Sequence, residues 1–523
     1  MPRQYITTAI DYPNAAPHMG HVLEKVLADV IARWFRLRGD NVRFQIGTDE
    51  HGIKIQQTAK KQGVTPEELV DRNVPLFTTL YRQMGISADV FVRTSDHPVD
   101  WQNPGAIQHR PTVEALWKKL QEAKMLEKRS YAGLYCPGCE KFITKKDLTD
   151  GKCPDHLCEP EEVKEENWFF LLSREEAWLK DLLTRSDGYR IIPDYRAEET
   201  KALLDRGLED VSFSRPKSSL AWGIPVPGDS GQTMYVWCDA LTNYISGLGL
   251  FTKSAEKEWW EDATVTHVIG KDIARFHACI WPAMLKNSGL PVPPPQQLLI
   301  HGFVTSEGQK MSKSLGNVVD PVEVLQRFNG NPDPLRFFLC HEIPVGRDGD
   351  FSWKRFEEMY DAMLRNKLGN LLNRVLVLLK KLDGTLAIEK EPAFIGGTDA
   401  WQRYGASMDA FDVWSAIHFA FDWLVACDKF ITEKEPWKMK DEAARKKVLS
   451  VLAENVRHLS LMLLPFIPDA AYRISKQLNV PYVEKMFEKD FVITEKMKEW
   501  GGVEDWKNVG EPEILFMPLA EEE

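Results

Sequence analysis

The chain has 523 residues, the length of about three ordinary domains. Hydrophobic residues make up 43% and charged residues 27%, which is typical of a soluble globular protein. The net charge of −11 excludes a protein that coats nucleic acid through overall positive charge, although a local basic face can still bind RNA. We find no run of about twenty apolar residues and no secretory signal, so we expect a cytoplasmic protein with no membrane partner.

The first elements follow a strand–loop–helix–strand pattern. The β-branched and aromatic residues of QYITTAI predict a strand up to Ile10, and apolar residues from Val22 to Phe35 repeat at helical spacing. We expect Gly39 to end this helix, and VRFQIGT predicts a second strand. This is the βαβ unit of a parallel sheet, so the sequence predicts a Rossmann-like α/β catalytic domain.

The pattern changes twice further along the chain. A segment rich in charge and turns carries four cysteines and interrupts the α/β pattern, which indicates an insertion. Long amphipathic segments later predict an α-helical bundle. We therefore expect the two catalytic halves at 1–116 and 228–325, the insertion at 117–227, a linker at 326–352 and a helical domain at 353–523.

Two short motifs suit a phosphate ligand. In PNAAPHMGHV, Gly20 lets a ligand approach the backbone where the strand gives way to the helix, and His18 and His21 can donate hydrogen bonds to phosphate oxygens. In KMSKS, Lys310 and Lys313 lie in a glycine-flanked loop that can close over polyphosphate. Taken alone, the first motif is more often a helix cap and the second an exposed basic loop.

The two motifs in this order resemble the signature pair of class I aminoacyl-tRNA synthetases. With AIDYPNAAPHMGH, GTDEHG, YVWCDALTNY, GKDIARFHACIWPAML and HGFVTSEGQKMSKSLGN, nearly the whole chain resembles the methionyl-tRNA synthetase family. The resemblance implies a ligase that activates L-methionine with ATP and then transfers it to the terminal adenosine of tRNA(Met), with Mg²⁺ accompanying the ATP. We expect a monomer, because the extra C-terminal module that some relatives use to dimerise is not seen.

The resemblance also implies the site residues. His18, His21, Lys310 and Lys313 would be catalytic, and ATP would be bound by these four together with Gly20 and Asp272. A thioether packs well against aromatic edges, a buried ammonium needs a counter-charge such as Asp49, and residues four apart share a helix face. The implied methionine pocket consists of Ala9, Ile10, Tyr12, Asp49, Trp237, Ala240, Leu241, Tyr244, His277 and Trp281.

Two positions depart from the pattern of the family. Asp11 and Leu241 stand where some members carry proline. We expect this departure to change the fine shape of the amino-acid pocket and to leave the substrate class the same.

Two cysteine pairs, CPGC and CPDHLC, have the spacing of a structural zinc site. Cys136, Cys139 and Cys153 supply three ligands. The fourth is either His156 or Cys158, and the resemblance favours His156. Four protein ligands leave no open position for water, so the ion would brace the insertion. A disulfide is the alternative, and the lack of an export signal disfavours it.

The resemblance further implies that the helical domain binds the anticodon of tRNA. Trp437 matches the position where a base stacks, and Asn370 and Arg374 match a polar pair that contacts base edges. From the residues alone, a solvated charged face and a core tryptophan would be preferred.

Other functions are alternatives. Leucine, isoleucine and valine synthetases carry a larger editing insertion, and a cysteine synthetase would spread its zinc ligands through the catalytic fold. A synthetase-like paralogue that binds RNA without catalysis should have lost signature residues, but all four are present. A plain nucleotidyltransferase would not need the helical domain.

Overall fold

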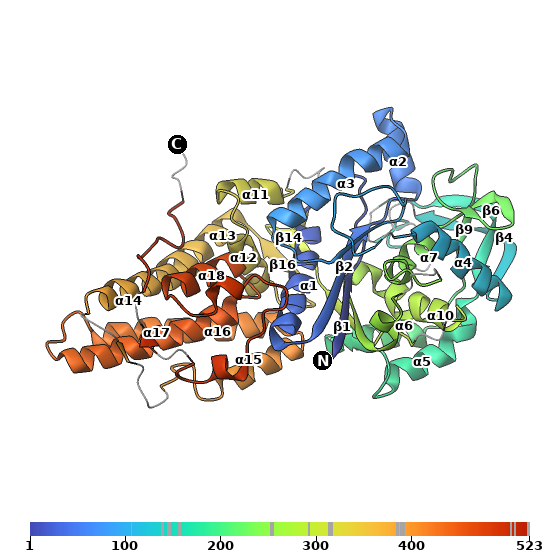
Figure 1. Cartoon of the computed structure of the whole chain (residues 1–523). Coiled ribbons are helices and arrows are strands. Elements are labelled where there is room, and N and C mark those ends of the chain that lie inside the picture. Colours follow the sequence, from blue (N-terminus) through green and yellow to red (C-terminus); the bar gives the residue numbers. More distant parts are fainter. Residues whose placement is uncertain are drawn as a thin grey trace.

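The computed structural model of the chain describes residues 1–105, 107–136, 141–143, 148–154, 158–251, 256–290, 293–311, 317–382, 386–387, 393–502, 505–506 and 509–519. Figure 1 shows an α/β half that holds the N-terminus and an elongated helical half beside it. None of the helices in these ranges has the length and apolar character that a membrane span requires.

A six-stranded sheet forms the centre of the α/β half, and its strand order is β3-β2-β1-β12-β13-β7. All neighbouring pairs are parallel. The strand order reverses at β1, because β2 and β3 lie on one side of it and β12, β13 and β7 lie on the other. The carboxyl ends of β1 and β12 therefore border the crevice where such sheets bind ligands. The strands are β1 (Arg3–Thr8), β2 (Asn41–Thr48), β3 (Val90–Arg93), β7 (Arg190–Ile192), β12 (Ala263–Gly270) and β13 (Gln297–His301).

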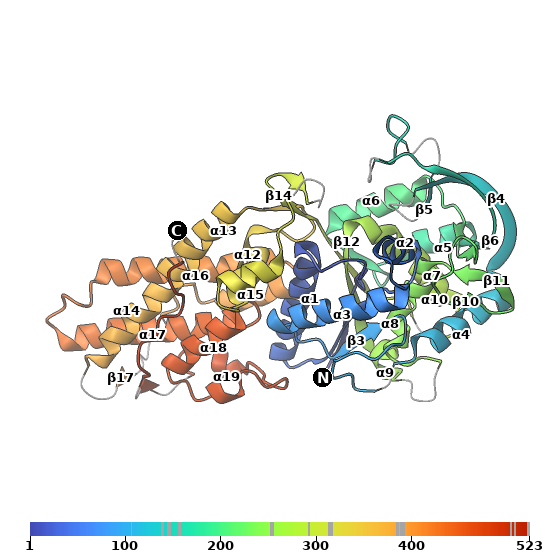
Figure 2. The same cartoon turned by 90° about the horizontal axis from the view of Figure 1, so that it is seen from above.

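The predicted βαβ unit is confirmed, with α1 (Met19–Arg38) between β1 and β2. The side chain of His18 caps α1 by accepting from the backbone N–H of Gly20. Gly39 ends the helix with a φ of 96°, a left-handed conformation that suits glycine. Both views place α1 between the sheet and the helical half, which explains why it is buried along most of its length (Figures 1 and 2).

Further helices cover the sheet and connect its strands. Near the N-terminal strands they are α2 (Ile53–Gln62), α3 (Pro66–Gln83) and α4 (His109–Glu122). Between β7 and β13 they are α6 (Asp194–Asp205), α7 (Val236–Leu241), α8 (Asn243–Ser246), α9 (Glu258–Glu261) and α10 (Trp281–Lys286), the last preceded by a π-helical turn at Phe276–Ile280.

The predicted insertion contains an antiparallel sheet of order β5-β4-β6-β8, which Figure 2 shows at the end of the molecule opposite the helical half. Its strands are β4 (Leu126–Cys136), β5 (Lys141–Ile143), β6 (Glu161–Phe170) and β8 (Val211–Ser212), and α5 (Glu176–Thr184) lies beside them. A second small sheet consists of β9 (Ser214–Pro216), β10 (Pro225–Val226) and β11 (Asp229–Met234).

One strand within 117–227 belongs to the main sheet. β7 pairs in parallel with β13, with Ile191 opposite Leu298. The segment 117–227, which we expected to be an insertion, therefore also contributes an edge strand of the main sheet. A three-residue strand between charged segments has too little periodicity to be recognised, so only its pairing with a distant strand reveals it.

The helical half contains long helices after residue 353, as predicted, and the longest are α16 (Val413–Lys434) and α17 (Glu442–Leu463). Its other helices are α11 (Pro321–Arg327), α12 (Asp333–Glu342), α13 (Trp353–Met359), α14 (Asn370–Lys380), α15 (Ala400–Asp409), α18 (Pro468–Gln477) and α19 (Glu495–Lys498), with a π-helical run at Tyr360–Gly369. A small pair, β17 (Leu386–Ala387) and β18 (Asp505–Trp506), also lies here.

The predicted linker at 326–352 is instead a packed joint between the two halves. Buried apolar side chains of α1, α12 and α14 to α18 form one continuous cluster. Arg336 of α12 is fully buried and pairs with Asp29 of α1 at 2.7 Å. The same guanidinium donates to the carbonyls of Pro465 and Phe466 in the helical half. The sequence could not reveal this joint, because a buried arginine that binds groups far away in the chain leaves no periodic signal.

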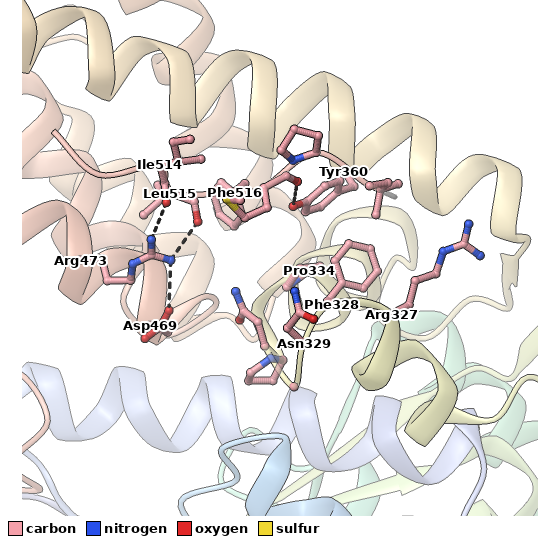
Figure 3. Close-up of a pocket in the computed structure, with 16 residues that line it drawn as sticks. Arg327, Phe328, Asn329, Pro334, Tyr360, Asp469, Arg473, Ile514, Leu515 and Phe516 are labelled. Carbon is pink, nitrogen blue, oxygen red and sulfur yellow. Dashed lines mark hydrogen bonds and ion pairs between the residues drawn. The ribbon is translucent and has the colours of Figure 1, made fainter. Parts of the chain in front are cut away.

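The last described segment, residues 509–519, lies against the helical half. A cavity of about 430 Å³ is bordered by this segment, α18 and the start of α12. Figure 3 shows the side chains that line it. Arg473 donates to the carbonyls of Ile514 and Leu515, and the hydroxyl of Tyr360 donates to the carbonyl of Met517. The two arginines that line the cavity pair with protein carboxylates, Arg327 with Glu357 and Arg473 with Asp469. The hydrogen bonds from Arg473 and Tyr360 attach the segment to the helical half.

Candidate active site

His18 and His21 lie where β1 leads into α1, at the crevice of the sheet. Their rings are stacked, with centroids 3.7 Å apart. The backbone N–H of Gly20 donates to Nδ1 of His18, and the backbone N–H of His18 donates to Nδ1 of His21, both at 3.1 Å. Since a backbone N–H can only donate, each Nδ1 accepts, and the proton of each neutral ring is on Nε2. The pair therefore presents two Nε2–H donors.

The environment keeps His21 neutral. Burial, followed by the nearby His18 and Lys25, lowers its pKa well below the ordinary value. Nε2 of His21 lies 4.0 Å from Oδ1 of Asp11. The ring can thus donate a hydrogen bond to an anion without first gaining a proton.

The apolar residues predicted for a methionine pocket come from three places along the chain. Ile10, Tyr12, Trp237 and Ala240 pack in one cluster, which also includes Leu220, Tyr235 and Val236. Leu241, Tyr244 and Trp281 belong to the neighbouring cluster, with Ala9 packed against it. The structure therefore brings the end of β1, α7 to α8 and α10 together at one edge of the sheet.

The polar atoms of this pocket are tied to one another. The hydroxyl of Tyr244 bonds to Nε2 of His277 at 2.6 Å, and Nδ1 of His277 bonds to the carbonyl of Ile273 at 3.0 Å. Because a carbonyl only accepts, Nδ1 carries the proton and the tyrosine hydroxyl donates to Nε2. Burial lowers the pKa of His277 to about 4, so the pocket wall is neutral at physiological pH.

His277 and Trp281 both lie against Tyr244, at centroid distances of 5.6 and 5.7 Å. The sequence predicts that these two residues share one face of a regular helix. The helix is irregular here, because His277 is in the π-helical turn and Trp281 begins α10. The two rings nevertheless lie on the same side, around one tyrosine.

Tyr12 is held by the loop after β2. Its hydroxyl donates to the carbonyl of His51 at 2.8 Å. Gly52 has a φ of 113°, and a Cβ there would lie 2.4 Å from the Tyr12 hydroxyl. Only glycine fits both the backbone and the tyrosine. This explains the glycine of GTDEHG and fixes Tyr12 at the pocket.

Asp49 lies at the end of β2, is 7% exposed, and donates its backbone N–H to the carbonyl of Asp11. Next to it, Asp239 binds Nδ1 of His51 at 2.6 Å and Nε2 of His109 at 2.7 Å. Burial alone would raise the pKa of Asp239, but the two histidines lower it to about 2. This buried carboxylate attaches α4 and α7 to the loop that carries Asp49.

Asp272 follows β12 on a short turn and is exposed. Its carboxylate folds back over the strand end, because a Cβ on Gly270 would lie 2.8 Å from its Oδ1. Lys310 lies in β15 (Gln309–Lys310), which pairs with β14 (Val304–Ser306), itself beside β16 (Gly349–Phe351). Lys313 lies outside the described residues.

The sequence analysis missed two residues of this site, Phe276 and Ile273. Phe276 stacks on Trp237, with centroids 3.4 Å apart, and Ile273 lends its carbonyl to His277. The indole N–H of Trp237 is buried and has no hydrogen-bond partner within the described residues. Both missed residues stand inside GKDIARFHACIW. Ile273 is four residues before His277 and Phe276 is four residues after Asp272, so helical spacing from these two identified residues could have found them.

The structure places part of the predicted zinc site. Cys136 and Cys153 are buried thiols, and Cys158 packs against them. Sγ of Cys136 lies 3.6 Å from Sγ of Cys158, much longer than the roughly 2.05 Å of a disulfide. Cys139 and His156 lie outside the described residues. Among the residues that the structure does describe, three or more potential ligands do not gather at one point.

The predicted anticodon residues gather at the helical half. Trp437 follows α16 and is 44% exposed, and the guanidinium of Arg374 on α14 lies 5.0 Å from its ring centroid. Asp428 on α16 binds Arg374 at 3.2 Å and Lys367 at 2.8 Å. Asn370 begins α14, one turn before Arg374. Exposure of a large indole beside a cation disfavours the core tryptophan considered above.

Comparison with known proteins agrees with this arrangement. A family described as "tRNA synthetases class I (M)" matches residues 4–163 and 156–376. A methionine–tRNA ligase of Brucella suis is 38% identical over 498 residues, covering 93% of each chain. One from Thermosynechococcus vestitus is 35% identical and covers 99% of this chain and 98% of its own.

Solved structures give the same result. Mycobacterium tuberculosis methionyl-tRNA synthetase in complex with methionyl-adenylate superposes with a TM-score of 0.83 at 35% identity, covering 91% of this chain and 94% of that one. The apo form from the same organism has a TM-score of 0.80. The sequence and the fold together show that this chain belongs to the methionyl-tRNA synthetase family of class I aminoacyl-tRNA synthetases.

Proposed function

We propose that this protein joins L-methionine to tRNA(Met) in two steps at the crevice of the parallel sheet. In the first, methionine attacks the α-phosphate of ATP to give methionyl adenylate and pyrophosphate. In the second, the methionyl group passes to the terminal adenosine of the tRNA. The observation that carries this proposal is the pair of neutral histidine donors beside a neutral, aromatic amino-acid pocket.

The ATP end of the site needs donors and positive charge. Nε2–H of His18 and of His21 would bind phosphate oxygens, and Gly20 leaves the helix N-terminus accessible to them. Lys310 and Lys313 would stabilise the charge that develops on the departing pyrophosphate, and Asp272 would bind the ribose. Mg²⁺ accompanies ATP in such chemistry and would neutralise phosphate charge, with the triphosphate itself supplying ligands.

The methionine end needs an apolar wall and one counter-charge. Aromatic rings and a polarizable thioether attract each other, and the tyrosine–histidine pair offers no charge that would disfavour the side chain. Asp49 is the carboxylate placed to bind the substrate ammonium, because a buried cation needs a counter-charge. The proposed pocket wall is Ala9, Ile10, Tyr12, Trp237, Ala240, Leu241, Tyr244, His277 and Trp281.

Amino-acid-dependent ATP–pyrophosphate exchange tests this function. We expect exchange with methionine, and with none of the other nineteen standard amino acids at equal concentration. The neutral pocket disfavours charged and strongly polar side chains, and its aromatic wall favours a thioether over the other apolar side chains. Exchange driven by leucine or isoleucine instead would overturn the pocket assignment and leave the class of enzyme intact. Folded protein that exchanges with no amino acid would favour a non-catalytic paralogue.

A structural zinc ion fits the cysteine cluster. Two sulfur ligands of tetrahedral zinc lie about 3.8 Å apart when each Zn–S bond is about 2.3 Å, which is close to the observed separation of Cys136 and Cys158. We propose that Cys136, Cys139 and Cys153 hold zinc with His156, which the family resemblance favours. The contact of Cys158 with Cys136 makes Cys158 the alternative fourth ligand.

We expect purified protein to carry one zinc ion per chain and Cys136→Ser to lose it, since three remaining ligands bind more weakly. Metal content by mass spectrometry or a colorimetric chelator measures this. His156→Ala and Cys158→Ala then form a matched pair, and we expect only the histidine variant to lose zinc. Loss in the cysteine variant alone would assign the fourth position to Cys158, and zinc retained by Cys136→Ser would end the proposal.

We propose that the helical half binds the anticodon. An exposed indole beside a guanidinium gives an unpaired base a surface for stacking, and Asn370 and Arg374 can bond to base edges. Asp428 holds Arg374 in place against thermal motion of its long side chain. By family resemblance, we further propose that the enzyme is a cytoplasmic monomer.

A further inference from the structure

A buried cluster of three charged side chains lies beneath the proposed site. Lys25 of α1 has no exposed surface, and Asp11 and Glu24 are 5% and 6% exposed. Nζ of Lys25 donates to Oδ1 of Asp11 and to Oε1 of Glu24, both at 2.7 Å. Buried charges are costly unless they are paired and fully hydrogen-bonded, so a cluster of this kind demands an explanation.

Lys25 uses its third proton on the strand that carries the methionine pocket. Nζ donates to the carbonyl of Ala9 at 3.0 Å, so all three protons of the ammonium are bound. Ala9 and the next residues form the proposed pocket wall. Lys25 also lies one helical turn after His21, on the same helix. One side chain therefore connects the amino-acid wall with the helix that carries the phosphate donors.

Asp11 extends this connection to the substrate counter-charge. Its Oδ2 accepts from the hydroxyl of Tyr81, and its carbonyl accepts from the backbone N–H of Asp49 at 2.8 Å. Its Oδ1, already bonded to Lys25, is 4.0 Å from Nε2 of His21. Asp11 is thus bonded to the backbone of Asp49, whose side chain is proposed to bind the methionine ammonium, and lies near His21, which is proposed to bind ATP.

Glu24 has a different set of contacts. Besides Lys25, it binds Nε2 of His301 at the end of β13, at 3.2 Å. Within the part of the chain that the structure describes, its side chain forms no hydrogen bond or ion pair with the proposed pocket or phosphate residues. Glu24 contributes a negative charge to the cluster through its bond to Lys25. The connection between the proposed methionine-binding and ATP-binding residues runs through Asp11 and Lys25.

We propose that Asp11 and Lys25 are positioning residues, which hold the methionine-binding end of β1 and the phosphate-binding start of α1 in the relative placement that the adenylation step requires. In that step the methionine carboxylate must meet the α-phosphate in line, and a misplacement of about 1 Å can reduce the rate about 10²-fold. Lys25 of the helix fixes this placement, because it binds Ala9 and Asp11 directly after the strand. The placement therefore does not depend on the rigidity of the connecting residues 12–18.

The test uses two variants that each remove one carboxylate from the same lysine. Asp11→Asn leaves the Lys25–Glu24 pair, and Glu24→Gln leaves the Lys25–Asp11 pair, so one positive and one negative charge remain in both. Lys25 and Tyr81 donate to different oxygens of Asp11. In asparagine one of these two positions is an NH₂ group, which donates, so the side chain cannot accept at both positions as Asp11 does. The comparison therefore separates loss of the strand-to-helix connection from loss of a buried charge.

We expect Asp11→Asn to lower kcat of methionine-dependent pyrophosphate exchange at least tenfold, with KM for methionine and for ATP within threefold of the parent. This split indicates lost alignment with each binding group intact. Rates are expressed per active site, from titration of the adenylate formed in one turnover, so that unfolded protein is not counted. We expect Glu24→Gln to stay within threefold in kcat.

Asp29→Asn on the same helix is the control for stability. Asp29 is fully buried and pairs with Arg33 and Arg336, away from the site. We expect it to lower the melting temperature and to leave kcat per active site unchanged. Equal kcat for Asp11→Asn and the parent, or a loss in Asp11→Asn that Glu24→Gln matches, would overturn the proposal. So would a rise in both KM values at constant kcat.

Discussion

Replacing His21 with asparagine is expected to lower kcat of methionine-dependent pyrophosphate exchange about 10²- to 10³-fold, the cost of removing one donor from a charge-stabilising site. The amide oxygen of asparagine can take the place of Nδ1 and accept from the backbone N–H of His18, so the start of α1 keeps its hydrogen bond. What is lost is the Nε2–H donor. The measurement is exchange at saturating methionine and ATP.

His21→Gln is the informative partner of this variant. The amide nitrogen of glutamine reaches about as far as Nε2 and can donate there, so we expect it to recover at least a tenth of the parent rate. His97→Asn is the matched control, because His97 pairs with Glu67 and Asp71 on the surface. If asparagine and glutamine at position 21 were equally inactive, a shape requirement would replace the donor role.

The sequence predicted those parts of the fold whose signal is local. The strand before Ile10 follows from its run of β-branched and aromatic residues. The helix up to Gly39 and the long helices after 353 follow from periodicity and end signals over ten or more residues. β7 did not, because three residues carry no period and the strand exists through its pairing with β13. The packed joint at α12 was missed for a similar reason, since Arg336 is held by groups far away in the sequence.

The candidate site was likewise predictable where the signal is local and unpredictable where it depends on contacts between distant residues. Motifs located His18, His21 and the aromatic residues, because these chemical types stand out in order along the chain. Their protonation was beyond the sequence, since it follows from which backbone N–H meets Nδ1 of each ring. Asp11 was noticed only as a departure from the family pattern. Its bond to Lys25, fourteen residues later, depends on how β1 and α1 pack.

The helical half leads to the second large expected effect. Trp437→Ala should lower kcat/KM for tRNA in aminoacylation about 10- to 100-fold, because stacking of one base on an aromatic ring contributes about 1–3 kcal/mol. Pyrophosphate exchange should stay within twofold, since the indole belongs to the helical half and the adenylation residues belong to the α/β half. The two assays on one protein preparation measure this difference.

Trp414→Ala is the matched control, because it removes an indole from α16 that lies against His418. Among the described residues, this indole forms no hydrogen bond, ion pair or ring contact with the proposed anticodon residues. We expect it to leave the ratio of the two activities unchanged. Arg374→Met provides a second test: it keeps an unbranched side chain beside Trp437 but removes the donors, so it should weaken discrimination between anticodons more than it weakens binding. If Trp437→Ala reduced exchange as much as aminoacylation, the indole would support the fold, and the tRNA would be recognised elsewhere.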